Sequence, residues 1–220
     1  MGMIISELAR QTMVQTQLAP QGIRNEAILK AFATVPRQDF LPVAYQHSGY
    51  CDHYIPLGNQ RYMMDCTTLA RLFEAAALQP AMSALVIGAN TGYAAVILSY
   101  LVSTVFALEE DKVFLKQITD AADRYSSGNI LPIEGPLKNG LPEHAPYDFI
   151  LIEGGVDVSL EHLYAQISPQ GALGTVIIHH HKAGSLTLIK RKIKQVTSVR
   201  LRDAYLPPLA AFQQEKRFKF

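Results

Sequence analysis

The segment from Ser83 to Glu110 constrains the fold of this chain more than any other part of it. It opens with an apolar run at 84–87, which has the length and composition of a buried parallel strand. A small-residue turn at 88–92 follows, and its two glycines can adopt backbone angles that other residues cannot. An apolar helix over 93–101 then leads to a second strand that ends on Glu109. This order is typical of the first half of a nucleotide-binding α/β sheet, in which the acid accepts hydrogen bonds from ribose hydroxyls.

The glycine turn reads G-x-N-x-G and differs from the G-x-G-x-x-G pattern of dinucleotide sites. A glycine turn by itself also fits a purely structural role, since many loops use glycine for geometry alone. With an acid at the end of the next strand, it predicts an adenosine-type site. An NAD-dependent oxidoreductase is the weaker alternative, because the glycine spacing argues against it.

The composition fits a single α/β domain in a cytoplasmic protein. The chain has 220 residues, of which 49% are hydrophobic, enough to bury one large core. We expect a helical extension with a substrate-side loop over 1–60, joined to the main domain over 61–220 as one structural unit. The net charge of +1 gives no reason to expect nucleic acid or a membrane surface as a partner. Two cysteines, no evident signal peptide and no apolar run of roughly 20 residues favour the cytoplasm.

Alternating hydrophobic patterns predict a mostly parallel seven-stranded sheet. Helices are expected over 3–18, 25–34, 65–78, 93–101, 111–126 and 159–167, with Asn25 and Asp65 as N-caps of the second and third. Strands are expected over 84–87, 104–108, 129–133, 147–152, 172–178, 186–196 and 198–206. The alternation implies right-handed crossovers and a parallel sheet. The last two strands leave no room for a helix between them, so they predict an antiparallel pair at one edge, with the basic run 190–194 on an exposed edge strand. The stretch 36–58 is expected to be irregular.

Several short motifs extend over nearly the whole chain. The most specific is V-P-R-x-x-F-x-P at 35–42, and the others are Met13-Val14-x-x-Gln17-Leu18, Gly22-Ile23, Tyr50-x-Asp52, Leu57-Gly58, Thr91-Gly92-Tyr93, Ala145-Pro146-Tyr147-Asp148 and the run 204–209. In these motifs the chain resembles the protein-L-isoaspartate O-methyltransferase family. The resemblance implies a Rossmann-like methyltransferase fold that binds S-adenosylmethionine. It also implies a role in protein modification and repair, with a protein or peptide carboxylate, or a small-molecule acceptor, as substrate.

The same resemblance implies where the cofactor binds. The glycine turn would lie beneath the methionine and ribose of S-adenosylmethionine, Glu109 would hold the ribose hydroxyls, and Leu137 would lie by the adenine. The residues expected at the cofactor are Gly88, Ala89, Asn90, Thr91, Gly92, Tyr93, Glu109, Glu110 and Leu137. Two family positions differ, since Val86 replaces an acid in the strand before the turn and Asn90 replaces a glycine. The third-strand loop, Gly135-Pro136-Leu137, also lacks the acid that the family carries near the adenine.

The acceptor side departs further from the family pattern. Where family members read G-x-Q-T-I-S-x-P, this chain places Met64 at the serine and Tyr62 at the threonine. A thioether cannot donate a hydrogen bond to a carboxylate, and Arg61 is the candidate to replace that contact with a charged one. The expected acceptor-side residues are Arg61, Tyr62, Met63, Met64 and Glu153. We therefore expect a methyltransferase with an altered choice of acceptor, and the alternative is an inactive family member that acts as a binding or regulatory protein.

Other chemistry-bearing residues have weaker interpretations. No catalytic group is assigned, because a carboxylate acceptor is already ionised near neutral pH and positioning carries most of the rate. Glu153, at the end of a predicted strand, is either a base or substrate contact, or a solvated loop acid. The run His179-His180-His181 has no acid or cysteine placed to complete a metal site, so no metal is expected. Cys66 lacks a paired histidine and is expected to pack in the core, and Asp148 is expected to have a structural or pocket-lining role.

Overall fold

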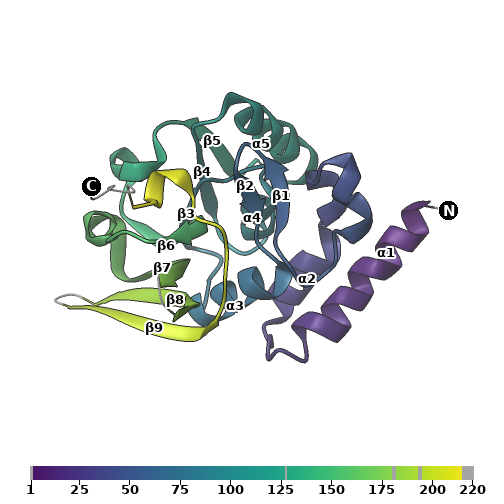
Figure 1. Ribbon diagram of the computed structural model, residues 1–220, viewed down its shortest axis with the longest axis horizontal. Helices are drawn as coiled ribbons and strands as arrows, with labels where there is room; N and C mark the ends of the chain where they lie inside the picture. Colours follow the sequence, from purple (N-terminus) through teal and green to yellow (C-terminus); the bar gives the residue numbers. More distant parts are fainter. Residues whose placement is uncertain (1, 127, 180–181, 193–194, 215–220) are drawn as a thin grey trace, which may run out of the picture.

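The computed structural model describes residues 2–126, 128–179, 182–192 and 195–214 (Figure 1). The α-helices are α1 (Gly2–Met13), α2 (Glu26–Thr34), α3 (Cys66–Ala76), α4 (Tyr93–Ser99) and α5 (Lys112–Tyr125). The strands are β1 (Ile55–Gly58), β2 (Arg61–Met63), β3 (Ser83–Ile87), β4 (Thr104–Glu109), β5 (Ile130–Glu134), β6 (Tyr147–Val156), β7 (Ile167–His179), β8 (Lys182–Lys192) and β9 (Gln195–Asp203). A π-helical turn (Val14–Leu18) continues α1, and short 3-10 segments lie in the connections.

Seven strands form one sheet in the order β5-β4-β3-β6-β7-β8-β9. The first five pair in parallel, whereas β8 and β9 are antiparallel to their neighbours. The expected mostly parallel sheet with an antiparallel pair at one edge is confirmed. The chain leaves β3 toward β4 on one side and returns as β6 on the other, so the strand order reverses between β3 and β6. In open α/β sheets, ligands bind at the carboxyl ends of the strands at such a reversal.

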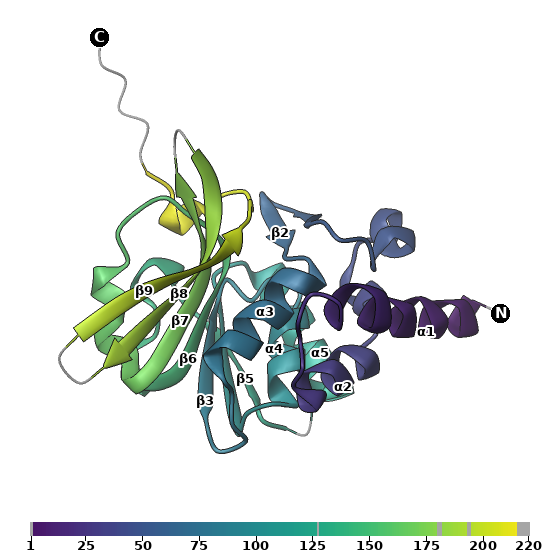
Figure 2. The ribbon, with the colours of Figure 1, turned by 90° about the horizontal axis from the view of Figure 1, so that it is seen from below.

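The two faces of the sheet are covered differently. All five α-helices lie on one face, as Figure 2 shows. Alternate residues of β3 separate the two cores, because successive side chains of a strand point to opposite faces. Ala84 and Val86 belong to the helix-side core, and Leu85 and Ile87 to the core on the other face. That second face is covered mainly by short 3-10 segments such as Glu161–Gln166.

Helix starts follow the sequence closely. The side chain of Asn25 accepts hydrogen bonds from the N–H groups of Ala27 and Ile28, and that of Asp65 accepts one from Thr68. Such caps satisfy backbone donors that the first helical turn leaves without partners. Both predicted N-caps are confirmed.

Four expectations about the elements are wrong. Residues 159–167 contain a 3-10 segment rather than an α-helix, because β6 runs on to Val156 and β7 begins at Ile167, leaving only 157–166 to connect them. The stretch 36–58 contains strand β1, which pairs with β2. The break between the last two strands comes earlier than expected, since β8 ends at Lys192 and β9 begins at Gln195. The basic run therefore starts on β8, an inner strand, and residues 193–194 lie outside the described part of the chain.

Two segments reach the carboxyl edge of the sheet from outside it. The hairpin β1–β2 turns at Asn59 and Gln60, which both have positive φ, as the tight two-residue turns of hairpins require. The segment after β9 forms a parallel bridge from Pro208 to Gly155 on β6, and Leu209 donates its N–H to the Gly155 carbonyl. Within the described residues, none of the helices has both the length and the apolar character that crossing a membrane requires.

Candidate functional site

The carboxyl ends of β3, β4 and β6 meet at the reversal of strand order. The glycine turn follows β3, Glu109 ends β4, and Glu153 lies near the end of β6. All three polar side chains here are buried: Asn90 is 1% exposed, Glu109 0% and Glu153 2%. Unpaired charges are almost never buried this completely, so the partners of the two carboxylates define what this edge can bind.

Both oxygens of Glu109 have hydrogen-bond donors within the protein. Its Oε1 accepts hydrogen bonds from the N–H groups of Glu110 (2.9 Å) and Asp111 (3.1 Å), and its Oε2 accepts one from the N–H of Asn90 (3.0 Å). The remaining partner is Arg61, whose Nη2 lies 2.8 Å from Oε1 and whose Nη1 lies 3.4 Å from Oε2. This bidentate pair takes the acceptor positions that a ribose diol would use.

Arg61 is itself buried and anchored in place. It is 6% exposed and also reaches Glu110 Oε1 at 3.3 Å and Asn90 Oδ1 at 3.5 Å. The tip of its hairpin is tied to the start of α5, because Asn59 Nδ2 donates to Asp111 Oδ2 at 2.8 Å. That hydrogen bond is the main cause that lowers the pKa of Asp111. The residue expected on the acceptor side thus lies against the expected ribose acid.

The glycine turn has the shape of a ligand cradle, but side chains fill it. Gly88 has a φ of +71°, and a Cβ on it would come within 2.9 Å of Leu209 Cδ2, 3.0 Å of Arg61 Nη1 and 3.5 Å of Leu137 Cδ1. Leu137, the residue expected beside the adenine, therefore lies close to the turn. Glu109, the turn and Leu137 suit an adenosine-type cofactor in kind and position. In the described conformation Arg61 contacts both Glu109 oxygens, and Arg61 and Leu209 lie against Gly88, so a cofactor at this place would have to displace them.

The other residues expected at the cofactor lie in different surroundings. Ala89 and Gly92 are in the turn, and a Cβ on Gly92 would come within 3.3 Å of Ile118 Cα, so this glycine allows α5 to pack closely. Tyr93 points into the helix-side core, where its ring meets that of Phe40 at 5.3 Å between centroids. The Arg37 guanidinium stacks over the same ring at 4.9 Å. Tyr93 thus lies apart from the side chains around Glu109.

The acceptor-side residues form a buried layer beside Glu153. Met63 and Met64 are 0% and 1% exposed, and the half-buried Tyr62 packs its ring against Tyr54. The carbonyl of Met64 accepts a hydrogen bond from Arg37 Nη2 at 2.7 Å. Arg37 is fully buried, and its Nε and Nη1 have no hydrogen-bond partner. The structure therefore brings Met64 and Glu153 together around Arg37.

Glu153 is a buried acid without a well-formed hydrogen bond. Neither of its oxygens has a hydrogen-bond partner, although Arg37, the Met64 backbone and Asn90 all lie close enough to stabilise its charge. Burial outweighs these attractions and raises the pKa of Glu153 to about 8. The interpretation as a solvated loop acid is wrong, because the side chain is 2% exposed and lies within β6 rather than in a loop.

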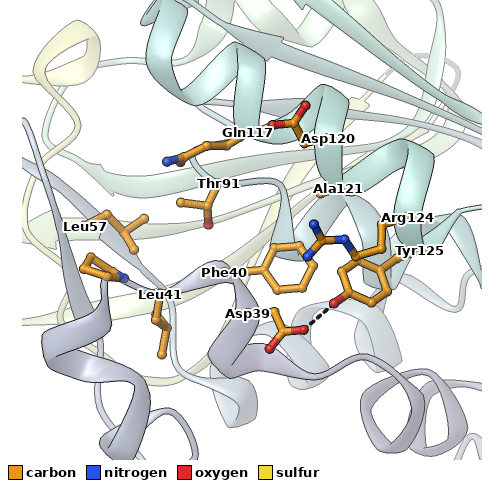
Figure 3. A pocket seen from close by; sticks show the side chains of 11 residues that line it. Asp39, Phe40, Leu41, Leu57, Thr91, Gln117, Asp120, Ala121, Arg124 and Tyr125 are labelled. Atoms are coloured by element: carbon orange, nitrogen blue, oxygen red, sulfur yellow. Dashed lines mark hydrogen bonds between the residues drawn. The ribbon is translucent and has the colours of Figure 1, made fainter.

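A cavity of about 450 Å³ opens on the helix side of the glycine turn (Figure 3). Its walls come from the loop after Pro36, from β1 and from one face of α5. The lining residues are Asp39, Phe40, Leu41, Pro42, Leu57, Thr91, Gln117, Asp120, Ala121, Arg124 and Tyr125. The Asp39 carboxylate accepts a hydrogen bond from the Tyr125 hydroxyl. Thr91, the one turn residue in the lining, has a buried hydroxyl without a partner.

Three further candidates have structural surroundings. Asp148 lies near the start of β6, at the opposite end of the sheet, and accepts hydrogen bonds from Ser83 N–H at 2.9 Å and Ser168 Oγ at 2.8 Å. Burial raises the pKa of the Cys66 thiol, which disfavours the nucleophilic thiolate. His179 ends β7 and contacts Ser185, whereas His180 and His181 lie outside the described residues. Over the described part of the chain, no three His, Cys, Asp or Glu side chains gather in a group that could hold a metal ion.

Three contributors to this region were missed from the sequence. Arg37 belongs to the most specific motif, yet its burial against Tyr93 and Met64 had no signal in the sequence. Leu209 reaches Gly88 only because the segment after β9 folds back onto β6. The cavity in Figure 3 joins loop 39–42 to α5, which are far apart along the chain. The motif segment 39–42, which lines the cavity, is the sequence feature that could have indicated it.

The family model and the curated relatives that match this chain belong to the same family. The model of the family described as protein-L-isoaspartate(D-aspartate) O-methyltransferase matches residues 9–209. A protein-L-isoaspartate O-methyltransferase of Koribacter versatilis (strain Ellin345) is 30% identical over 206 residues, covering 94% of this chain and 92% of the relative. One of the same name from Methylorubrum extorquens (strain PA1) is 35% identical over 185 residues, covering 83% and 78%.

Two solved structures share the fold. One, a protein-L-isoaspartate O-methyltransferase, superposes with a TM-score of 0.77 at 23% identity, covering 91% of this chain and 66% of that one. Another, a putative protein-L-isoaspartate O-methyltransferase of Plasmodium falciparum in complex with S-adenosyl-L-homocysteine, gives a TM-score of 0.73 at 17% identity, covering 92% and 98%. At these identities the likeness concerns the fold, which confirms the expected Rossmann-like methyltransferase architecture.

Proposed function

The chain belongs to the protein-L-isoaspartate(D-aspartate) O-methyltransferase family, and on that premise we propose that it is an S-adenosylmethionine-dependent O-methyltransferase acting on a carboxylate. The observation that carries the proposal is the family match over residues 9–209, which contains both the glycine turn and Glu109. These two features lie side by side at the reversal of strand order, where this class of sheet binds its ligands. The relatives bear the name of the enzyme and so favour an enzyme over an inactive binding protein.

Methylation of a carboxylate requires no catalytic base among the side chains near the acceptor. A carboxylate acceptor is ionised near neutral pH, so its methylation needs no strong base. The raised pKa of Cys66 fits this, since no activated nucleophile is called for. Because Arg61 contacts both Glu109 oxygens in the described conformation, we assign no catalytic step to individual residues. Glu110, 3.3 Å from Arg61, and the buried Leu137 remain the proposed neighbours of the cofactor alongside the turn and Glu109.

The acceptor is a protein or peptide in this proposal, with a small molecule as the alternative. Tyr62, Met63, Met64 and Glu153 are the proposed acceptor-side residues. A buried acid at this place would repel a carboxylate when ionised, and its raised pKa keeps it largely protonated at neutral pH. Met64 offers no hydrogen bond to a carboxylate, so in this proposal another group holds the acceptor carboxylate.

We also propose that residues 1–60 and 61–220 form one structural unit. The hairpin β1–β2 spans the boundary between them, and α2 packs into the same core as α3 and α4. Both cysteines are unpaired, Cys51 exposed and Cys66 buried, which supports a reducing compartment such as the cytoplasm.

Methyl transfer to paired peptides tests this function. The purified chain is incubated with S-adenosylmethionine labelled in its methyl group and with an isoaspartyl peptide or the aspartyl peptide of identical sequence. Transfer to the isoaspartyl peptide alone, as a base-labile ester, is the expected result. Equal transfer to both peptides would indicate an altered acceptor. No transfer to any acceptor, together with no binding of S-adenosylmethionine, would contradict the proposal and indicate the inactive family member.

A further inference from the structure

We propose that Arg61 is an internal occupant of the cofactor site, and that S-adenosylmethionine binds only when Arg61 releases Glu109. This inference rests on the proposed function, because it names what controls entry to that site. The observation behind it is that the acid expected to hold a ribose is already saturated by a side chain of the same protein. No other group in the described residues takes both Glu109 oxygens at once.

The guanidinium imitates a ribose diol in its hydrogen bonding. Two parallel N–H groups of Arg61 meet the two oxygens of Glu109, as two vicinal hydroxyls would. The arginine adds a full positive charge, so its hydrogen bonds are stronger than those of neutral hydroxyls in a buried place. A cofactor that competes for Glu109 must therefore displace a stronger partner.

The side chains packed against the glycine turn also indicate that Arg61 occupies the cofactor site. The ideal Cβ position on Gly88 lies 3.0 Å from Arg61 Nη1 and 2.9 Å from Leu209 Cδ2, so both side chains rest on the floor of the turn. A ligand approaching the turn's backbone would overlap Arg61 before reaching it. The cavity shown in Figure 3 lies on the helix side, with Thr91 in its lining, and includes neither Gly88 nor Glu109.

Arg61 can be removed without leaving Glu109 unsupported. Three backbone N–H groups, those of Asn90, Glu110 and Asp111, would still hold the carboxylate in its present orientation. The oxygen positions that Arg61 vacates would then be free to accept hydroxyl donors. Substitution of this one residue should therefore free the Glu109 oxygens for a ligand, and only the tip of the Leu209 side chain would then have to shift.

The hairpin supplies the means of release. Arg61 is the first residue of β2, directly after the two-residue turn, and the contact from Asn59 to Asp111 is exposed. The hairpin is a separate two-stranded sheet, outside the seven-stranded one. Movement of Arg61 away from Glu109 would therefore break no strand pairing of the main sheet.

Calorimetric titration with S-adenosylhomocysteine tests the proposal. Arg61→Ala and the milder Arg61→Gln are expected to bind at least tenfold more tightly than the wild-type chain. Arg61→Lys keeps the charge but cannot make the bidentate contact, so its affinity should lie between those of the wild type and Arg61→Ala. Arg200→Ala, which removes an exposed arginine on β9, is the matched control and should leave the affinity unchanged. Thermal unfolding of each variant confirms that it is folded before titration.

The outcomes separate this proposal from the function on which it rests. If the wild type and Arg61→Ala bind the ligand with equal affinity, Arg61 does not compete with the cofactor, and the proposed function stands. If no folded variant binds, both the function and the occupant proposal are overturned, because a site that stays closed without Arg61 is not closed by it. Tighter binding by Arg61→Ala and Arg61→Gln, with Arg61→Lys between them and the wild type, supports both.

Discussion

Glu109 and Arg61 form a buried bidentate ion pair, with Arg61 Nη2 2.8 Å from Glu109 Oε1 and the two side chains 7% and 0% exposed. The two residues lie on β4 and β2, which are not neighbours in any sheet. The pair therefore joins the hairpin to the main sheet at the point where we propose that the cofactor binds.

This pair predicts unequal effects of removing its two members. Glu109→Ala would leave Arg61 and three backbone N–H groups without their hydrogen-bond acceptor. We therefore expect it to lower the free energy of unfolding by about 4 kcal/mol. Arg61→Ala should cost less, about 2 kcal/mol, since Glu109 keeps its backbone donors. Urea unfolding of both variants and of the double variant measures the coupling, which we expect to exceed about 1 kcal/mol. Strictly additive losses would show that the ion pair is absent in solution.

The raised pKa of Glu153 predicts a pH-dependent stability. The folded state holds the proton up to about pH 8, whereas the unfolded chain loses it near pH 4.5. The folded state therefore binds more protons in this window, and its stability falls as the pH rises through it, by up to about 1.4 kcal/mol per pH unit. Glu153→Gln removes the titration, so its stability relative to wild type should increase between pH 5 and 8 and then level off.

Urea unfolding at pH 5, 6, 7 and 8 checks this dependence. Glu143→Gln is the matched control, because Glu143 is an exposed acid in a short 3-10 segment. A Glu153→Gln difference that stays constant over this range would mean that Glu153 titrates normally and is solvated.

Asp148 is predicted to stabilise the fold without affecting the ligand site. It joins the starts of β3 and β7 through Ser83 and Ser168, at the end of the sheet away from Glu109. Asp148→Ala removes the acceptor for both donors and should cost about 1 to 3 kcal/mol. Thermal unfolding measures the loss, and titration of S-adenosylhomocysteine into Arg61→Ala with and without Asp148→Ala measures the site. A change in affinity of tenfold or more would contradict a purely structural role.

The parts of the fold set by local chemistry could be predicted from the sequence. Asn25 and Asp65 cap helices because their side chains reach nearby N–H groups, and Glu109 is placed by the strand on which it lies. The hairpin β1–β2 was missed because its turn residues, Asn59 and Gln60, lack the glycine that usually marks such a turn.

The parts set by contacts between distant segments could not be predicted in the same way. Arg61 was expected near the acceptor, and its pairing with Glu109 depends on how the hairpin docks on the sheet. Tyr93 follows the glycine turn, but the helix it starts directs its ring toward Phe40 and Arg37. Glu153 is buried because β6 extends beyond it and because the segment after β9 folds back onto β6. The positions of these side chains depend on packing that no local pattern encodes.

The most direct test of the account asks whether Glu109 holds the cofactor once Arg61 is gone. S-adenosylhomocysteine is titrated into Arg61→Ala and into the double variant Arg61→Ala/Glu109→Gln, whose side chain keeps the shape of the acid without its charge. We predict binding to the first and at least a tenfold weaker binding to the second, because ribose hydroxyls donate more strongly to a carboxylate than to an amide. Equal binding by the two variants, or none by either, would contradict the assignment of this edge of the sheet as the cofactor site.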